Sequence, residues 1–270
     1  MIRTGSIGLD IALHGGWTPG IHEIWGDTGS GKTVLALHAA EEATRARTDT
    51  LWVDTVGGVA HMDNAPTVVV LPEREAERAF SVMEMACDER SIGLIVVDSA
   101  NYLVRRAELN GDPSFVPHPQ REYKDELTSL KRVAVATGTV VLFVSQPRDK
   151  ERQPVRGTGI SEKVKYRVHL HPDVIHQNGD REIQATVKDV PGKITKHDVA
   201  RFTIKPGFGI ARALELVHVA DRMGLIGHRG TWYHCDGWSA QGASGFAAIV
   251  DDTNLRYTLD KRVREATGIG

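Results

Sequence analysis

A glycine-rich segment with a single lysine is the part of the sequence whose residue types and spacing most clearly predict chemistry. It fits the pattern G-x-x-x-x-G-K-[ST] at every fixed position and consists of Gly26, Asp27, Thr28, Gly29, Ser30, Gly31, Lys32 and Thr33. Such glycines let backbone N–H groups converge on a phosphate, and a helix beginning near Gly31 adds the positive end of its dipole. Lys32 would then reach the β- and γ-phosphates, and Thr33 would hold Mg²⁺. The segment therefore predicts a site for a nucleoside triphosphate with magnesium.

Two further polar residues follow apolar runs that we expect to be strands of the same sheet. Asp98 ends the run 94–97, and a carboxylate in this place orients the magnesium shell, because the phosphate loop and the strand ends meet at one edge. Gln146 follows the run 140–144 and Ser145, where its amide could bind the γ-phosphate and report its loss to the next segment. Lys32, Asp98 and Gln146 are the predicted catalytic residues, and Thr33 and Asp98 the predicted metal ligands.

Apolar runs that alternate with helical patterns predict the scaffold for these residues. The candidate strands are 23–25, 51–54, 68–71, 94–98 and 140–144, with helices near 73–89 and 121–136. This alternation is typical of an α/β fold with a largely parallel central sheet and helices on both faces. Three later runs, 165–170, 182–187 and 200–204, predict an antiparallel extension. A helix, a glycine-rich segment and a charged helix then predict a small C-terminal α+β domain at 211–270, after a core at 1–210.

Composition and cysteine content limit the possible classes of protein. The chain has 270 residues, 41% of them hydrophobic, which is ample for one α/β core and a small appendage. No segment resembles a membrane span or a signal peptide. Cys87 and Cys235 cannot form a disulfide framework, so we expect core thiols in a reducing cytoplasm.

The distribution of charge leaves a nucleic-acid role open. A net charge of −2 argues against a surface coated in positive charge, so a DNA contact would need a local basic patch. The segment 148–167 holds seven basic and three acidic residues. Charge alone favours a DNA-binding patch and a solvated loop of mixed charge equally.

Together these motifs resemble the RecA-type strand-exchange recombinases, from about Thr4 to the C-terminus. The resemblance is carried by residues 4–13, the phosphate loop, Asp98-Ser99, Ser145-Gln146, residues 229–233 and Gln241-Gly242. It implies a RecA-like phosphate-loop ATPase core that uses ATP and Mg²⁺ and self-associates into a homo-oligomer or filament on single-stranded DNA. Such a filament pairs its strand with homologous duplex DNA in recombination and repair. The compact chain is similar to versions encoded by bacterial viruses, for which the host cytoplasm is the expected location.

The resemblance places DNA contacts in two loops, near 105–120 and 147–162. In the first loop Phe115 or Val116 could insert between bases, and Arg121, just after it, matches a phosphate-contacting arginine of the family. In the second loop, basic side chains and backbone N–H groups could bind phosphates without reading bases. The residues expected to do so are Arg148, Arg152, Arg156, Gly157, Thr158 and Gly159.

Two lysines are expected to contact the nucleotide of a neighbouring subunit. Lys188 matches a family lysine that reaches the neighbour's γ-phosphate. Val190 stands where a second lysine is expected, so Lys193 is the candidate substitute.

The sequence departs from the family at its water-activating carboxylate. Val56 stands at that position, two residues after Asp54. Losing a general base typically costs about 10²- to 10⁴-fold in rate. Asp54 or Asp63 could replace it, or hydrolysis could be slow or absent while ATP binding persists.

A second departure concerns assembly. The chain begins close to the core, without the N-terminal helix and strand with which bacterial relatives hold the next subunit. Filament, ring and monomer therefore all remain open.

Two alternative functions compete with a recombinase, and one histidine cluster has the spacing of a metal site. A non-hydrolysing or slow ATP switch could coat single strands as a scaffold or annealing protein. A RecA-fold motor or regulator without a DNA role would have no reason to keep Arg121 and two glycine-bearing loops. A zinc site is conceivable at His169, His171, Asp173 and His176, because strand residues two apart share a face.

Overall fold

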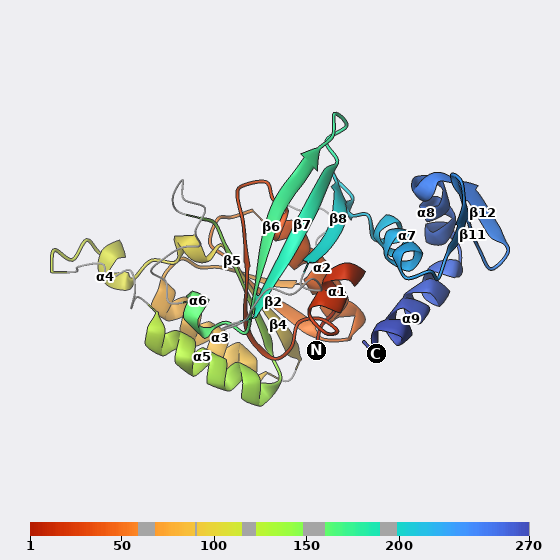
Figure 1. Cartoon of the computed structure of the whole chain (residues 1–270). Coiled ribbons are helices and arrows are strands. Elements are labelled where there is room, and N and C mark those ends of the chain that lie inside the picture. The colour runs from red at the N-terminus through yellow and green to blue at the C-terminus, as the bar shows by residue number, and fades with distance from the viewer. Residues whose placement is uncertain (59–67, 90, 115–122, 148–159, 190–198, 270) are drawn as a thin grey trace.

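The computed structural model describes residues 1–58, 68–89, 91–114, 123–147, 160–189 and 199–269. Figure 1 shows a central sheet with the C-terminal helices gathered beside it. The core elements in chain order are α1 (Ile7–Ala12), β1 (Gly20–Trp25), α2 (Lys32–Arg45), β2 (Asp49–Asp54), β3 (Val68–Pro72), α3 (Ala76–Asp88), β4 (Ile92–Asp98), η2 (Ala100–Tyr102), α4 (Arg106–Leu109), α5 (Lys124–Thr137), β5 (Val140–Ser145), α6 (Ile160–Lys163), β6 (Tyr166–Ile175), β7 (Arg181–Asp189), β8 (Val199–Lys205) and β9 (Gly209–Ile210).

The central sheet has nine strands in the order β3-β2-β4-β5-β1-β6-β7-β8-β9. The pairs from β3 to β6 are parallel, and those from β6 to β9 are antiparallel. The predicted largely parallel sheet with an antiparallel extension is therefore confirmed. Because β4, β5 and β1 are neighbours, the segments that follow them emerge at one edge of the sheet.

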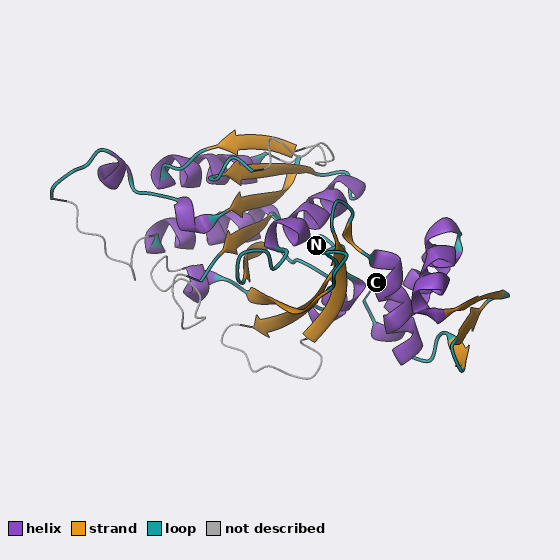
Figure 2. Ribbon diagram, turned by 90° about the horizontal axis from the view of Figure 1, so that it is seen from above, coloured by secondary structure: helices purple, strands orange, loops and turns teal. Residues whose placement is uncertain are grey.

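Helices cover both faces of the sheet, as Figure 2 shows. The core on one face is built around α2, whose Leu35, Ala36 and Ala39 are fully buried at helical spacing. The core on the other face contains α3 and α5, with Phe80, Met83 and Cys87 of α3 all buried at helical spacing. Both faces of the sheet are buried, which explains why its strands are continuous apolar runs in the sequence.

The C-terminal segment consists of α7 (Arg212–Arg222), β10 (Gly227–Arg229), β11 (Trp232–Cys235), β12 (Trp238–Gln241), α8 (Gly242–Asp252) and α9 (Leu255–Thr267). The glycine-rich stretch forms a three-stranded antiparallel sheet. Helix α8 was missed in the sequence because Gly242 and Gly245 lower its helix propensity, whereas Phe246 and Val250 stabilise it by burial. Among the described helices, none is long and apolar enough to span a membrane.

Buried carboxylates join the start of the chain to these C-terminal helices. Glu215 of α7 accepts hydrogen bonds from the Ser6 hydroxyl and the Gly8 N–H, at 2.5 and 2.9 Å. Asp10 of α1 pairs with Arg264 of α9 at 2.9 Å. Ile7 belongs to the same apolar cluster as the C-terminal helices. The predicted domain boundary at residue 210 remains a prediction, and residues 6–10 pack with the segment beyond it.

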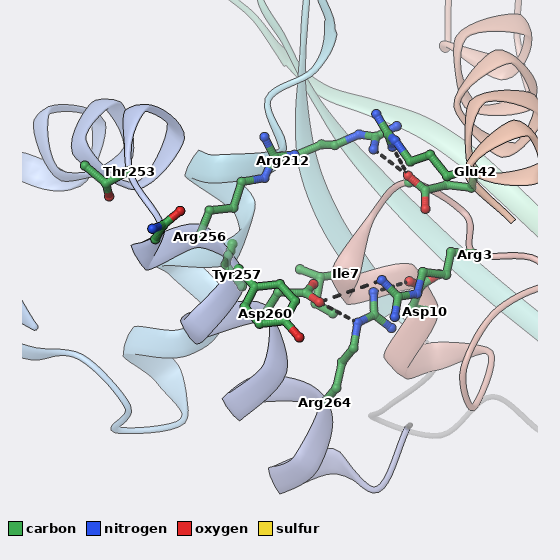
Figure 3. Close-up of a pocket in the computed structure, with 14 residues that line it drawn as sticks. Arg3, Ile7, Asp10, Glu42, Arg212, Thr253, Arg256, Tyr257, Asp260 and Arg264 are labelled. Carbon is green, nitrogen blue, oxygen red and sulfur yellow. Dashed lines mark hydrogen bonds and ion pairs between the residues drawn. The ribbon is translucent and has the colours of Figure 1, made fainter. Parts of the chain in front are cut away.

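A cavity of about 480 Å³ opens at this junction (Figure 3). Five arginines line it, and each already pairs with a carboxylate, four of them with one that also lines the cavity. Arg264 lies between Asp10 and Asp260, and Arg212 bonds to Glu42 at 2.6 Å. The cavity therefore lies between elements that ion pairs hold together, and no residue of the phosphate loop lines it.

Candidate nucleotide site

The glycine-rich segment forms a tight loop between the end of β1 and the start of α2. Its glycines are required by conformation and by space. Gly31 has φ +91°, and a Cβ there would lie 2.2 Å from the Ile204 side chain of β8. Gly26 has φ +156°, and its Cβ would lie 2.3 Å from the Leu170 carbonyl oxygen of β6. The antiparallel extension therefore packs directly on the loop and excludes side chains at these positions.

Lys32 is the first residue of α2 and folds back into the loop. Its Nζ donates hydrogen bonds to the carbonyl oxygens of Gly26 and Asp27, at 2.9 and 2.8 Å. Burial lowers the pKa of the ammonium group, and the negative charges of Asp98 and Asp27 oppose this shift. A buried cation whose hydrogen bonds, among the described residues, go to backbone carbonyls is suited to receive phosphate oxygens.

Thr33 and Asp98 meet as the sequence predicts. The Thr33 hydroxyl donates to Asp98 Oδ2 at 2.7 Å, which joins the start of α2 to the end of β4. Burial raises the pKa of the Asp98 carboxyl group, and nearby Asp54 raises it further, whereas Thr33 and Lys32 lower it. A hydroxyl and a carboxylate side by side are hard oxygen donors of the kind that Mg²⁺ prefers. The donor set fits magnesium.

Gln146 follows β5 and lies beside Thr28 of the loop. Its Oε1 is 3.5 Å from the Thr28 hydroxyl, at the outer limit of a hydrogen bond. The backbone of Gln146 is held more firmly, because the Asn101 side chain donates to its carbonyl at 2.9 Å and accepts from its N–H at 2.8 Å. The predicted sensor is therefore positioned beside the phosphate loop by a residue of η2.

Asn101 belongs to a polar network that the sequence analysis missed. Its N–H contacts the Ser99 hydroxyl at 3.3 Å, and the Ser99 backbone exchanges two 2.8 Å hydrogen bonds with the Thr55 hydroxyl. The network ties together the ends of β2, β4 and β5. A serine and an asparagine just beyond Asp98 were the only sequence signals, and such residues are common in turns.

Val56, at the position expected for the general base, cannot accept a proton. The Val56 side chain is 60% exposed and carries no proton acceptor. Asp54 Oδ1 accepts hydrogen bonds from the N–H groups of Val56, Gly57 and Gly58, at 3.1, 2.7 and 3.3 Å. Asp54 therefore holds the turn at the end of β2 through its side chain.

Glu23, Ser145 and Arg167 form a buried polar group on the strands next to Gln146. Glu23 of β1 accepts from the Ser145 hydroxyl at 2.5 Å and pairs with Arg167 of β6 at 2.7 Å. Glu23 is only 2% exposed. This group links the strand before the phosphate loop, the strand before Gln146 and β6.

The histidines of β6 do not assemble into a metal centre among the described residues. His169 stacks on Trp25 with a ring separation of 3.9 Å. Burial lowers the pKa of His169, and the charges of His171 and Lys188 lower it further. His176 pairs with Glu182 at 2.8 Å at the far end of the hairpin, so the zinc alternative is not supported.

The remaining predicted contacts divide between described and undescribed parts of the chain. Lys188 is exposed on β7, paired in register with Arg167. The other predictions lie outside the described residues, namely Asp63, Phe115, Val116, Arg121, Arg148, Arg152, Arg156, Gly157, Thr158, Gly159 and Lys193. They remain predictions.

The sequence is similar to a known protein family and to its members. The family described as the RecA N-terminal domain matches residues 1–155. The protein RecA of Frankia casuarinae is 30% identical over 99% of this chain and 84% of its own length. The protein RecA of Gluconacetobacter polyoxogenes is 29% identical over the whole of this chain and 84% of its own length.

A solved structure shares the fold. The crystal structure of the RadB recombinase matches with a TM-score of 0.56 and 21% sequence identity. The match covers 78% of this chain and 98% of that one. At this level of identity the likeness establishes the fold alone.

Proposed function

The chain belongs to the RecA family, and from that membership we propose that it is an ATP-dependent DNA recombinase that binds single-stranded DNA. One observation carries the proposal. Lys32, Thr33, Asp98 and Gln146 converge at one edge of the sheet, in a chain that matches RecA proteins over its full length. The proposed partners are single-stranded DNA, homologous duplex DNA and further copies of the same chain.

Different groups of the site bind different parts of ATP and its metal ion. The N–H groups of residues 26–33 bind and orient the phosphates, and Lys32 neutralises their charge. Thr33 and Asp98 would hold Mg²⁺, which supplies positive charge beside the transferring phosphoryl group. Gln146 senses the γ-phosphate and connects to the segment 148–159, which carries the proposed DNA contacts.

The DNA contacts are proposed on the same grounds of family membership. Phe115, Val116 and Arg121 belong to the first loop, and the basic and glycine residues of 148–159 to the second. Lys188 and Lys193 are proposed to contact the nucleotide of a neighbouring subunit. Contacts of this kind would make ATP binding and self-association depend on each other.

A second candidate function is favoured by one specific observation. Val56 occupies the place of the general base, and Asp54 Oδ1 is engaged by three backbone N–H groups. A slow or non-hydrolysing ATP switch that coats single strands for annealing would need the phosphate loop and Gln146, but no base.

Single-stranded DNA binding with and without ATP, with phosphate release followed in the same sample, tests both candidates. A recombinase should bind DNA only with ATP and release phosphate faster when DNA is present. Binding that requires ATP without phosphate release would favour the switch. No DNA binding in either condition would refute both, and Lys32→Ala is the control that should abolish the ATP dependence.

A further inference from the structure

Arg181 is the first residue of β7, where the antiparallel extension passes over the phosphate loop. Its Nη1 donates a hydrogen bond to the carbonyl oxygen of Gly29, with an N–O distance of 2.5 Å. Gly29 has φ +79°, and a Cβ there would lie 3.1 Å from the same nitrogen. A glycine at this position therefore allows the guanidinium to approach the loop backbone.

The strand pattern directs this cation to the loop. Ile183, Ala185 and Val187 are buried against the core that contains α2, and side chains two apart share a face. The same alternation places Arg181 on that face, where an apolar residue would continue the stripe. Among the described residues no salt bridge joins Arg181 to a carboxylate, and its hydrogen bond goes to the loop itself.

The geometry of the peptide bond makes this contact important for nucleotide binding. The bond between Gly29 and Ser30 is trans, so the Gly29 carbonyl and the Ser30 N–H point in opposite directions. The Ser30 N–H donates a hydrogen bond to the Asp27 carbonyl oxygen at 3.1 Å, and the same oxygen also accepts from Lys32 Nζ at 2.8 Å. The Ser30 N–H therefore points to the interior of the loop, where the lysine lies.

We propose that Arg181 is a positioning residue of the phosphate loop, which holds the Gly29 carbonyl from outside and so fixes the backbone conformation of the loop that receives bound phosphate. This inference rests on the proposed ATP-binding function. Because Arg181 acts through the loop, its effect extends to nucleoside diphosphates and triphosphates alike. A charge-assisted hydrogen bond is stronger than a neutral one, which is why an arginine suits this role.

Titration of the full-length chain with the fluorescent nucleotides mant-ATP and mant-ADP, in the presence of Mg²⁺, tests the inference. Arg181→Ala should weaken both nucleotides by the same factor, about 10-fold. Arg181→Lys, which keeps the charge and a donor, should recover part of the loss. Hydrogen exchange at residues 27–31 of the nucleotide-free protein should be faster in Arg181→Ala.

The matched control is Arg201→Ala on β8. The Arg201 side chain is 61% exposed and contacts Gln184 and Asp173, away from the loop. This variant should bind both nucleotides as the wild type does. Unchanged affinity in Arg181→Ala would overturn the inference, and weakening of mant-ATP alone would replace it with a direct γ-phosphate contact. A wild-type chain that binds neither nucleotide would refute the proposed function itself.

Discussion

Replacing Glu215 with glutamine should remove a large part of the pH dependence of folding. Glu215 is 2% exposed, and its Oε2 has no hydrogen-bond partner among the described residues. Burial raises the pKa of its carboxyl group to about 7, with a smaller contribution from Asp10, and the bonds from Ser6 and Gly8 only partly oppose this. The folded protein therefore keeps a proton on Glu215 up to about neutral pH.

The sign and size of the effect follow from proton binding. In the unfolded chain the carboxyl group titrates near 4.5, so unfolding between pH 4.5 and about 7 releases a proton. The contribution of Glu215 to stability is present at low pH, falls as pH rises through this window, and is lost above it. The difference between the two pKa values corresponds to about 3 kcal/mol.

Urea unfolding followed by circular dichroism from pH 4 to pH 8 measures this contribution. The free energy of unfolding of the wild type, minus that of Glu215→Gln, should fall by about 3 kcal/mol across the range. Buried groups that do not interact with Glu215 titrate in both proteins and cancel in the difference. Glu265→Gln on α9, whose side chain is 65% exposed, should follow the wild type. Parallel curves for the wild type and Glu215→Gln would refute the reasoning.

Two further predictions concern turnover. Val56→Glu should raise the rate of ATP hydrolysis by at least about 10-fold, because it adds a proton acceptor at an exposed position, while Val56→Gln should not. An unchanged rate in phosphate-release assays would mean that another group already activates water. Asn101→Ala removes both hydrogen bonds to the Gln146 backbone, so DNA-stimulated hydrolysis should fall about 10-fold while mant-ATP affinity stays within about threefold. Loss of affinity equal to loss of stimulation would argue against a sensor role for Gln146.

Local patterns in the sequence were sufficient to predict the elements that surround the phosphate loop. The G-x-x-x-x-G-K-[ST] segment, the apolar run before Asp98 and the run before Gln146 each combine a strand with a polar residue at its end. Parallel strands place their carboxyl ends at one edge of a sheet, so proximity of these residues followed from the fold class. The 2.7 Å hydrogen bond from Thr33 to Asp98 agrees with that expectation.

Helix α8 and the polar network around Asn101 could not be predicted from sequence patterns. Glycines obscured the helical pattern of α8, and its stability comes from burial of Phe246 and Val250 against other helices. The Asn101 side chain bonds to a backbone 45 residues away. Neither feature has a local signature, because both depend on partners that folding brings together.

The sequence by itself determined the α/β class, the phosphate loop and the strand-end residues, since these depend on periodicity and on short motifs with fixed geometry. Only the tertiary structure decided that Arg181 lies on Gly29, that Asn101 holds Gln146 and that Glu215 is buried against Ser6 and Gly8. The physical reason is that hydrogen bonds and pKa values depend on distance and burial. Both quantities are set by contacts between segments far apart in the chain.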